Sequence, residues 1–421
     1  VENKKVPFRH APGLSLFFSG EIPDQHAVFL DGSSFFILDE YSFFKSGNAY
    51  YHSLPEKSPY LLLQNKVENI LQVGFVGTNR LYASHHYTDA NIDIIDKDLL
   101  LFDISRDFLG KRFSHFLRTN KVTVIQDSPI YFLTKQNKKY DIIDISFTQF
   151  SSFSSQASYA DIPSEYLSLD SCIVFKKRLS EQGVLVYSFW QKNPPLNVLK
   201  TIDLLESCNF KKENIKIVES IQTATIIATK SKTDSKSFLE FTKKQGFEVT
   251  ASQHFYDKKK LSLKQLQKDF SLEKVTDNKP YFNHFSRPES VFSFFFTTDR
   301  VLAKHALLDP SYVFLWISFF ITFFLSFFCV ILPLNVFSKN NFDKLNFTFI
   351  VYFLSLGLGF MMLEIVFLEK VKFLIHEKTT SISLVLGCFL AFAGLGSYTY
   401  NYWKEKTPYF VICIYGVFLA L

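Results

Sequence analysis

The stretch that decides the fold is "VENILQVGFVGTNRLYASHHYTDANIDIIDKDLL", residues 67–100. It contains an apolar run, a turn with glycines, a helix-like stretch and a second apolar run that ends at Asp96. This order predicts a strand, a turn, a crossover helix and a second, parallel strand, which is how a nucleotide-binding crossover begins. The turn "GFVGTN" (74–79) has fewer glycines than such turns usually carry. The sequence therefore predicts a modified ligand-binding turn.

Three further strand-like runs follow, each short, rich in Val and Ile and bounded by turn residues. They are "KVTVIQD" (121–127), "YDIIDIS" (140–146) and "GVLVYSFW" (183–190). Amphipathic stretches separate the runs, and we expect one of them, 165–183, to be a helix that stops at Gly183. The alternation predicts an α/β doubly wound sheet, Rossmann-like, with helices on both faces.

The C-terminal quarter of the chain has the composition of membrane-spanning segments and not of a soluble domain. The run 311–337 holds more than twenty residues without a charge, enough to cross a bilayer core of about 30 Å. Second and third spans are expected at about 347–367 and 381–400, and 408–421 would form a fourth if the chain continued. Because the chain starts without Met and stops inside an apolar run, we expect it to be part of a longer protein.

The predicted organisation has four parts. A small β-rich N-terminal part covers 1–60, and the doubly wound sheet covers 61–230. A segment that completes this domain and connects it to the membrane covers 231–310, and at least three transmembrane helices cover 311–421. The expected partners are membrane lipid and either other membrane subunits or a second copy of the chain.

The charge and the cysteine spacing argue against a nucleic-acid-binding protein, a zinc protein and a disulfide-rich protein. The net charge of +6 is mild and forms no dense Lys/Arg stripe, so nucleic acid is not an expected partner. The five cysteines include no C-x-x-C pair, so we expect neither a zinc site nor a disulfide framework, and a reducing compartment for the soluble part. They are Cys172, Cys208, Cys329, Cys388 and Cys413. His85 and His86 are expected on a solvated helix face, without a metal.

Glu364 lies within the second expected span, where an ionised carboxylate is costly. It could contact an ion or proton or anchor neighbouring helices. It could equally lie near the interface, with its carboxylate extended to water or held by a Ser or Tyr of another helix.

The carboxyl ends of the predicted strands carry the candidate binding residues. Gly74 and Gly77 let backbone N–H groups approach a ligand closely. Asp96 can accept both hydroxyls of a ribose, and Asp127 can accept the exocyclic amine of an adenine. Because strand ends of a parallel sheet converge at one crevice, we expect these residues to act together. The absence of G-x-G-x-x-G favours a nucleoside of the S-adenosylmethionine type over NAD.

At this point the chain resembles the spermidine synthases and their bacterial integral-membrane relatives. The segment 28–63 is similar to the N-terminal hairpin of that family and to its helix with a Tyr-His pair, here Tyr51 and His52. "ILQVGFVGTN" (70–79), "IDIIDKD" (92–98) and "VTVIQDSPIYFL" (122–133) are similar to its glycine loop, ribose-binding acid and adenine-side acid. "VTDNKPYFNHF" followed by apolar spans is similar to its membrane branch.

The resemblance implies a Rossmann-like methyltransferase fold and S-adenosylmethionine or decarboxylated S-adenosylmethionine as cofactor. It places Asp96 on the ribose and Asp127 on the adenine, with Tyr51, His52 and the segment 146–149 near the transferred group. It also implies the bacterial inner membrane, with the soluble domain in the cytoplasm.

The chain departs from the family where an amine substrate is handled. The loop 76–79 lacks the family's acid, and Ser146 and Gln149 stand where its catalytic Asp is expected. Asp144 lies on the strand, in a register that we expect to point its side chain elsewhere. Ser53 replaces the Glu that follows the Tyr-His pair. A neutral side chain cannot take a proton from an amine as a carboxylate can.

Three functions stay open from the sequence. The first is a transferase that uses the nucleoside, with Ser146, Gln149, Tyr51 and His52 as candidate catalytic residues. The second, favoured over aminopropyl transfer by the missing carboxylates, is a non-enzymatic sensor or structural subunit of a membrane complex. The third is a transporter-linked protein in which Glu364 and the spans do the main work and the soluble domain regulates.

Overall fold

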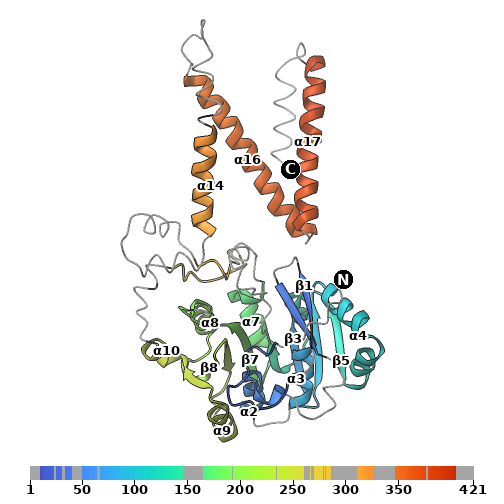
Figure 1. The fold of residues 1–421 in the computed structure, drawn as a ribbon, viewed down its shortest axis with the longest axis vertical. Helices are drawn as coiled ribbons and strands as arrows, with labels where there is room; N and C mark the ends of the chain where they lie inside the picture. The colour runs from blue at the N-terminus through green and yellow to red at the C-terminus, as the bar shows by residue number, and fades with distance from the viewer. Residues whose placement is uncertain are drawn as a thin grey trace. The chain divides into compact units, whose positions relative to one another are not determined.

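The structure is a computed structural model whose chain forms two compact units, residues 1–320 and 321–421 (Figure 1). The described residues are 10–22, 25–30, 34–39, 50–63, 67–145, 165–191, 193–233, 235–259, 266, 270–277, 279, 281–285, 311–326, 328, 347–375 and 378–403.

The first unit is built on an eight-stranded sheet with the order β10-β8-β9-β7-β6-β3-β4-β5. Strands β5, β4, β3, β6 and β7 are parallel, whereas β9 and β10 pair antiparallel with their neighbours. The strand bounds are β3 Asn69–Val73, β4 Asn91–Asp96, β5 Val122–Gln126, β6 Tyr140–Asp144, β7 Leu179–Trp190, β8 Ile215–Glu219, β9 Thr223–Thr229 and β10 Glu248–Ala251. This confirms the predicted doubly wound, Rossmann-like methyltransferase fold.

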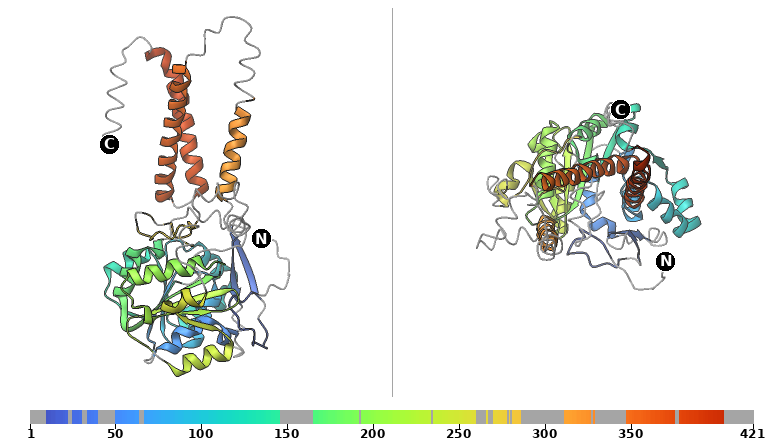
Figure 2. Two further views of the ribbon diagram at one scale, coloured as in Figure 1. Left: turned by 90° about the vertical axis from the view of Figure 1, so that its left-hand side faces the viewer. Right: turned by 90° about the horizontal axis from the view of Figure 1, so that it is seen from above.

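Helices cover both faces of this sheet (Figures 1 and 2). Because side chains alternate along a strand, β3 buries Leu71 in one hydrophobic cluster, with α7 and α8, and Ile70 in another, with α3 and α4. The helix bounds are α2 Ser58–Leu62, α3 Thr78–Tyr87, α4 Leu100–Thr119, α5 Pro129–Lys135, α7 Leu169–Arg178, α8 Leu196–Ser207, α9 Lys236–Gln245 and α10 Ser252–Lys258. Short 3₁₀ turns are η1 Tyr50–Ser53, η2 Pro55–Lys57, η3 Glu165–Leu167 and η4 Lys212–Asn214.

The N-terminal β part is a hairpin of β1 (Gln25–Leu30) and β2 (Ser34–Asp39). Its end is fixed by Asp39, a buried carboxylate that accepts hydrogen bonds from Gln25 Nε2 and from the hydroxyls of Tyr50 and Tyr51 at 2.6–2.9 Å. Three donors offset the cost of burying this charge. The hairpin therefore packs directly against the 3₁₀ turns that follow it.

The predicted helix stop at Gly183 was wrong. Helix α7 ends at Arg178, and Gly183 lies inside β7. The pairing of β7 with β6 shifts register between Tyr140 and Ile142, as at a bulge. A Cβ at Gly183 would lie 3.0 Å from the carbonyl oxygen of Tyr140, so the glycine serves the bulge instead of a helix end.

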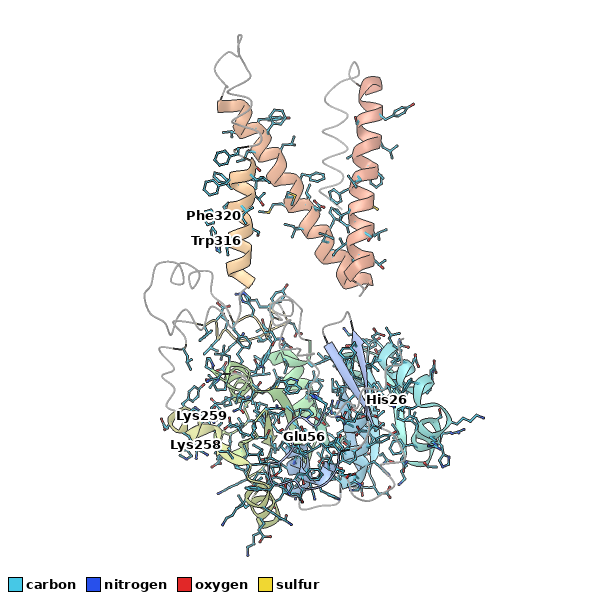
Figure 3. All side chains as sticks on the ribbon, in the orientation of Figure 1. His26, Glu56, Lys258, Lys259, Trp316 and Phe320 are labelled. Atoms are coloured by element: carbon cyan, nitrogen blue, oxygen red, sulfur yellow. A yellow bond between two sulfur atoms is a disulfide. The ribbon has the colours of Figure 1, made fainter. Side chains whose placement is uncertain are left out.

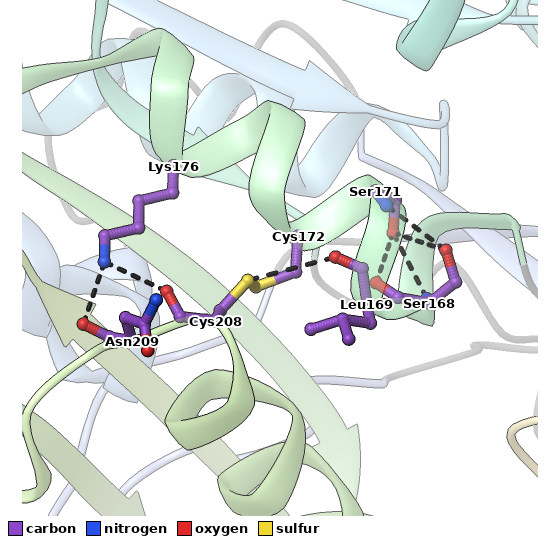
Figure 4. Close-up of a disulfide and its surroundings, with 7 residues drawn as sticks. All are labelled: Ser168, Leu169, Ser171, Cys172, Lys176, Cys208 and Asn209. Atoms are coloured by element: carbon purple, nitrogen blue, oxygen red, sulfur yellow. Dashed lines mark hydrogen bonds between the residues drawn. A yellow bond between two sulfur atoms is a disulfide. The ribbon is translucent and has the colours of Figure 1, made fainter. Parts of the chain in front are cut away.

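The cysteine spacing predicted no disulfide framework, but the structure forms one disulfide. Cys172 of α7 and Cys208, directly after α8, are joined by a disulfide with a Cα–Cα distance of 6.3 Å (Figure 4). Lys176 Nζ donates to the backbone carbonyls of Cys208 and Asn209 beside it. The two cysteines are 36 residues apart in sequence, and the packing of α7 against α8 brings them together.

The C-terminal quarter forms apolar helices, as predicted. Helices α16 (Phe347–Ile375) and α17 (Lys378–Trp403) contain windows, Val351–Leu368 and Thr380–Tyr398, that are long and apolar enough to cross a membrane. Helix α14 (Ser311–Ser326) is apolar but shorter. The fourth expected span, 408–421, lies outside the described residues.

The two long helices contact each other through aromatic rings, with Phe389 of α17 against Phe360 and Phe367 of α16. Glu364 lies on α16 and is half-buried.

Candidate functional site

Asp96, at the end of β4, holds the glycine-bearing loop. Its Oδ2 accepts a hydrogen bond from the backbone N–H of Phe75 at 2.9 Å, and its Oδ1 accepts one from Asp98 N–H at 3.2 Å. Burial raises the pKa of Asp96. The side chain is partly exposed.

The two glycines of the loop serve the turn itself. Gly74 has φ +76 and donates its N–H to the Ile95 carbonyl at 2.8 Å. Gly77, with φ +119, directly precedes α3 and pairs with Ile37 of the N-terminal hairpin. A Cβ at Gly77 would lie 2.3 Å from the Ile37 carbonyl oxygen. Glycine is required here because the hairpin backbone approaches the loop.

Asp127 lies next to Asp96 at the neighbouring strand end. Its N–H donates to the Asp96 carbonyl at 3.1 Å, and its Oδ1 accepts from Ser128 N–H at 2.7 Å. Asp127 is half-buried. The sheet therefore brings Gly74, Asp96 and Asp127 together at the carboxyl ends of its parallel strands. The ring of Phe75 packs into the core, where its contact with the ring of Phe102 is T-shaped.

Tyr51 and His52 lie in η1 and point to different places. Tyr51 is fully buried, and its hydroxyl donates to Asp39 at 2.6 Å. His52 is exposed, with Nε2 2.7 Å from His86 Nε2 and Nδ1 3.1 Å from Lys57 Nζ. Burial, Lys57 and His86 lower the pKa of His52 to about 4. No group of three or more possible metal ligands occurs among the described residues.

The other two candidates for catalysis, Ser146 and Gln149, lie outside the described residues.

A cavity of about 100 Å³ opens beside α3, between the N-terminal segments and the ends of β6 and β7. Its size exceeds the space that one water needs and is below the roughly 300 Å³ of a small drug-sized pocket. Its polar and aromatic walls are formed by His10, Tyr50, Glu56, Tyr60, Asn79, Arg80, Ser84, Tyr87, Asp144 and Trp190. None of the residues predicted for the nucleoside lines it.

Glu56 is the unusual member of this cavity (Figure 3). It lies in η2, and its Oε2 is buried without a hydrogen-bond partner among the described residues. Burial raises the pKa of Glu56 to about 8, and the negative charge of Asp144 adds to the shift while Arg80 opposes it. Glu56 is therefore largely protonated in the cavity at neutral pH.

Arg80 and Asp144 form a buried ion pair on the same wall. Arg80 Nε lies 2.7 Å from Asp144 Oδ2, and an Nη2 hydrogen of Arg80 is donated to the Asp144 carbonyl. Asp144 was expected to point away from the family's catalytic position, and the structure turns it into this cavity, beside Arg80. Alternation along β6 turns Ile143 toward the α7 side and Asp144 toward α3, which supplies the arginine.

Aromatic side chains form the remaining walls. The rings of Tyr60 and Tyr87 lie 4.9 Å apart, and Tyr60 donates to Ser84 Oγ at 2.9 Å. Burial raises the pKa of both tyrosines. His10 lies 5.5 Å from Trp190, and burial lowers the pKa of His10 to about 4, so it is neutral at pH 7. Neutral aromatic walls with a carboxyl group suit a small cation.

The sequence reasoning did not single out Glu56 or Arg80 as residues of this cavity. The available signal was a single acid within the apolar segment "YYHSLPEKSPYLLL" (50–63). An acid there is unusual because buried carboxylates need a partner. The charges that act on it, Arg80 and Asp144, come from α3 and β6, which no local pattern reveals.

No protein-family model and no curated protein matches the chain. It is similar in part to a probable spermidine synthase from Corynebacterium glutamicum ATCC 13032, with 10% identity and a TM-score of 0.40 over 60% of this chain and 94% of that one. The chain is also similar to the spermidine synthase of Thermotoga maritima, with 12% identity and a TM-score of 0.35 over 69% of this chain and 96% of that one. Human methyltransferase-like protein 13, in complex with SAH, is similar with 14% identity and a TM-score of 0.34 over 45% of this chain and 84% of that one. Likenesses of this size carry no inference about ligand or activity, and the fold class rests on the chain's own strand order.

Proposed function

We propose that the first unit is a transferase-like domain with two adjoining sites. The edge formed by Gly74, Asp96 and Asp127 holds a nucleoside of the S-adenosylmethionine type. The cavity around Glu56 receives the amino group of an acceptor. The observation that carries this proposal is Glu56 Oε2, which is buried without a hydrogen-bond partner among the described residues, in a cavity with aromatic walls.

The residues at the strand ends fit such a nucleoside. Asp96 and Asp127 are adjacent, partly exposed carboxylates, and the loop N–H groups already fix the orientation of Asp96. Asp96 would accept the ribose hydroxyls, and Asp127 would accept the adenine amine. The nucleoside, when bound, supplies an activated carbon on a sulfonium sulfur.

Glu56 would supply the acid–base chemistry that the neutral candidates Ser146 and Gln149 cannot supply. An amine reaches its site as an ammonium and must lose a proton before its nitrogen can form a bond. A carboxyl group with a pKa of about 8 is matched to that transfer near neutral pH. The ammonium would displace the Glu56 proton on binding, because an opposite charge favours the ionised carboxylate. The Arg80–Asp144 pair holds the wall in place.

We also propose that α16 and α17 anchor the chain in the bacterial inner membrane, with the first unit in the cytoplasm. Their length and apolar composition support the anchor. The Cys172–Cys208 disulfide weighs against the cytoplasm, where such bonds are rare. Alkylation of whole cells followed by mass spectrometry decides the point: two alkylated cysteines support the cytoplasm, and an intact disulfide refutes it.

A non-enzymatic sensor or structural subunit is the second candidate. The Arg80–Asp144 pair favours it, because an ion pair inside the cavity neutralises a carboxylate that an acceptor would otherwise use. In that case the Asp96 carboxylate, bound to two backbone N–H groups, serves only the loop.

Calorimetry on the detergent-solubilised full chain tests the proposal. S-adenosylmethionine, decarboxylated S-adenosylmethionine and methylthioadenosine are titrated into the wild type, Asp96→Ala and, as a control, Asp107→Ala on exposed helix surface. Binding that is lost only in Asp96→Ala supports the nucleoside site. If none of the three binds the wild type, the second candidate holds.

The amine site is tested separately, with putrescine as the probe. Binding by the wild type should release a proton, seen as a heat that depends on the ionisation enthalpy of the buffer. Glu56→Gln should lose this proton release and weaken putrescine binding, while nucleoside binding stays. Equal putrescine binding by Glu56→Gln would exclude the cavity as the amine site.

A further inference from the structure

Helix α4 has an outer face that the proposed reaction does not use. Its backbone breaks at Gly110, where φ is +65 and ψ is −144, so the helix consists of two halves. The inner face of both halves is buried in the core, through Leu101, Phe102, Ser105, Phe113 and Phe116. The outer faces of the two halves differ in chemistry.

The first half exposes a stripe of large apolar side chains. Leu100 is 56% exposed, Ile104 38% and Phe108 48%. The spacing i, i+4, i+8 puts them on one side of the helix. Phe108 contacts the ring of His26 at its edge, with ring centroids 4.8 Å apart. Because other residues of α4 fill the core, this stripe contributes little to the fold.

The second half is cationic. From Phe108 to Gln126 the sequence contains no acid. Lys111, Arg112, Arg118 and Lys121 are all exposed, and none forms an ion pair with a described residue. The acids of the first half are already engaged, since Arg106 lies 2.9 Å from Asp103 and 3.5 Å from Asp107. Three exposed cations therefore lie on the second half of α4 and a fourth, Lys121, lies just after it, all C-terminal to the apolar stripe in the chain.

We propose that this outer face, defined by Leu100, Ile104, Phe108 and the four cations, docks on the surface of an anionic bilayer. An apolar stripe beside cationic side chains is the pattern of interfacial helices: the apolar groups enter the headgroup boundary and the cations meet lipid phosphates. If the partner were a second copy of the chain, its four cations would face these four cations and repel them. The charge favours lipid.

The chain also supplies the bilayer, and here the inference rests on the proposed anchoring by α16 and α17. Because the anchor and the first unit belong to one chain, the first unit stays at a high effective concentration near the bilayer, and a weak surface affinity is sufficient for docking.

Photo-crosslinking to lipid tests the docking. The full chain is reconstituted in phosphatidylcholine nanodiscs that contain a photoactivatable phosphatidylcholine, with or without added phosphatidylserine, and crosslinked peptides are mapped by mass spectrometry. We expect crosslinks in the 100–121 region, which increase with phosphatidylserine and decrease at high salt.

Two variants probe the two halves. Lys111→Gln with Arg112→Gln should lower the α4 crosslinks roughly fivefold or more, since each cation near an anionic surface is worth about that factor. Ile104→Asp, made separately, should lower them to a similar extent, because it puts a negative charge into the apolar stripe. The matched control is Leu239→Asp on α9, which removes a side chain that is 57% exposed and should change nothing.

Crosslinks in α16 and α17 without any in α4 would overturn the docking and leave the anchor intact. Crosslinks in none of these helices would overturn the anchor and the docking together. Protein–protein crosslinks between copies through α4, with no lipid on it, would assign the face to a second chain and also refute the proposal.

Discussion

Glu56→Gln should stabilise the fold, and increasingly so as the pH rises. The pKa of Glu56 in the folded chain, about 8, lies above the ordinary value of 4.5 because burial disfavours the charged form. Its bound proton therefore contributes stability that is complete below pH 4.5 and is lost as the pH rises toward 8. Gln is uncharged, has the shape of the protonated acid and lacks this pH dependence.

The size of the effect follows from the shift. Each pKa unit corresponds to about 1.4 kcal/mol, so a shift of this size changes the free energy of unfolding by roughly 5 kcal/mol between the two limits. For a unit of this length that is a difference in Tm of roughly 5–10 °C.

The assay is thermal unfolding of the solubilised full chain at pH 5, 6, 7 and 8, comparing wild type with Glu56→Gln. The two should unfold at similar temperatures at pH 5 and diverge by pH 8, with the variant more stable. Glu240→Gln, on the exposed side of α9, is the control and should follow the wild type. A Tm difference that is the same at every pH would refute a buried, protonated Glu56.

Three further substitutions test the packing around the sites by chemical unfolding. Lys200→Met should cost about 2–4 kcal/mol, because this buried amine donates to two backbone carbonyls of the segment 281–285; an unchanged midpoint would contradict that. Gly77→Ala should cost about 2 kcal/mol more than Gly110→Ala, since both have positive φ and only at Gly77 would the Cβ meet a carbonyl oxygen; equal costs would show that the hairpin yields. Asp144→Asn should cost about 3–5 kcal/mol by removing the charge that neutralises buried Arg80, and a neutral result would place this pair in solvent.

The sequence by itself determined the architecture. Runs of Val and Ile bounded by turn residues gave the strands of the parallel sheet, since such residues fill a surface buried on both sides. Uncharged length gave α16 and α17. The order of strands also determined that Gly74, Asp96 and Asp127 share an edge, because the carboxyl ends of parallel strands meet there.

Only the tertiary structure decided the cavity and its chemistry. Glu56, Arg80 and Asp144 come from a 3₁₀ turn, a helix and a strand, and their charges interact only after the sheet and hairpin have assembled. The Cys172–Cys208 pairing likewise depends on the packing of α7 on α8. Local periodicity records which face of an element is buried, whereas a pKa depends on the groups that other elements bring within a few ångströms. That is why the raised pKa of Glu56 is decided by tertiary structure and not by its local sequence.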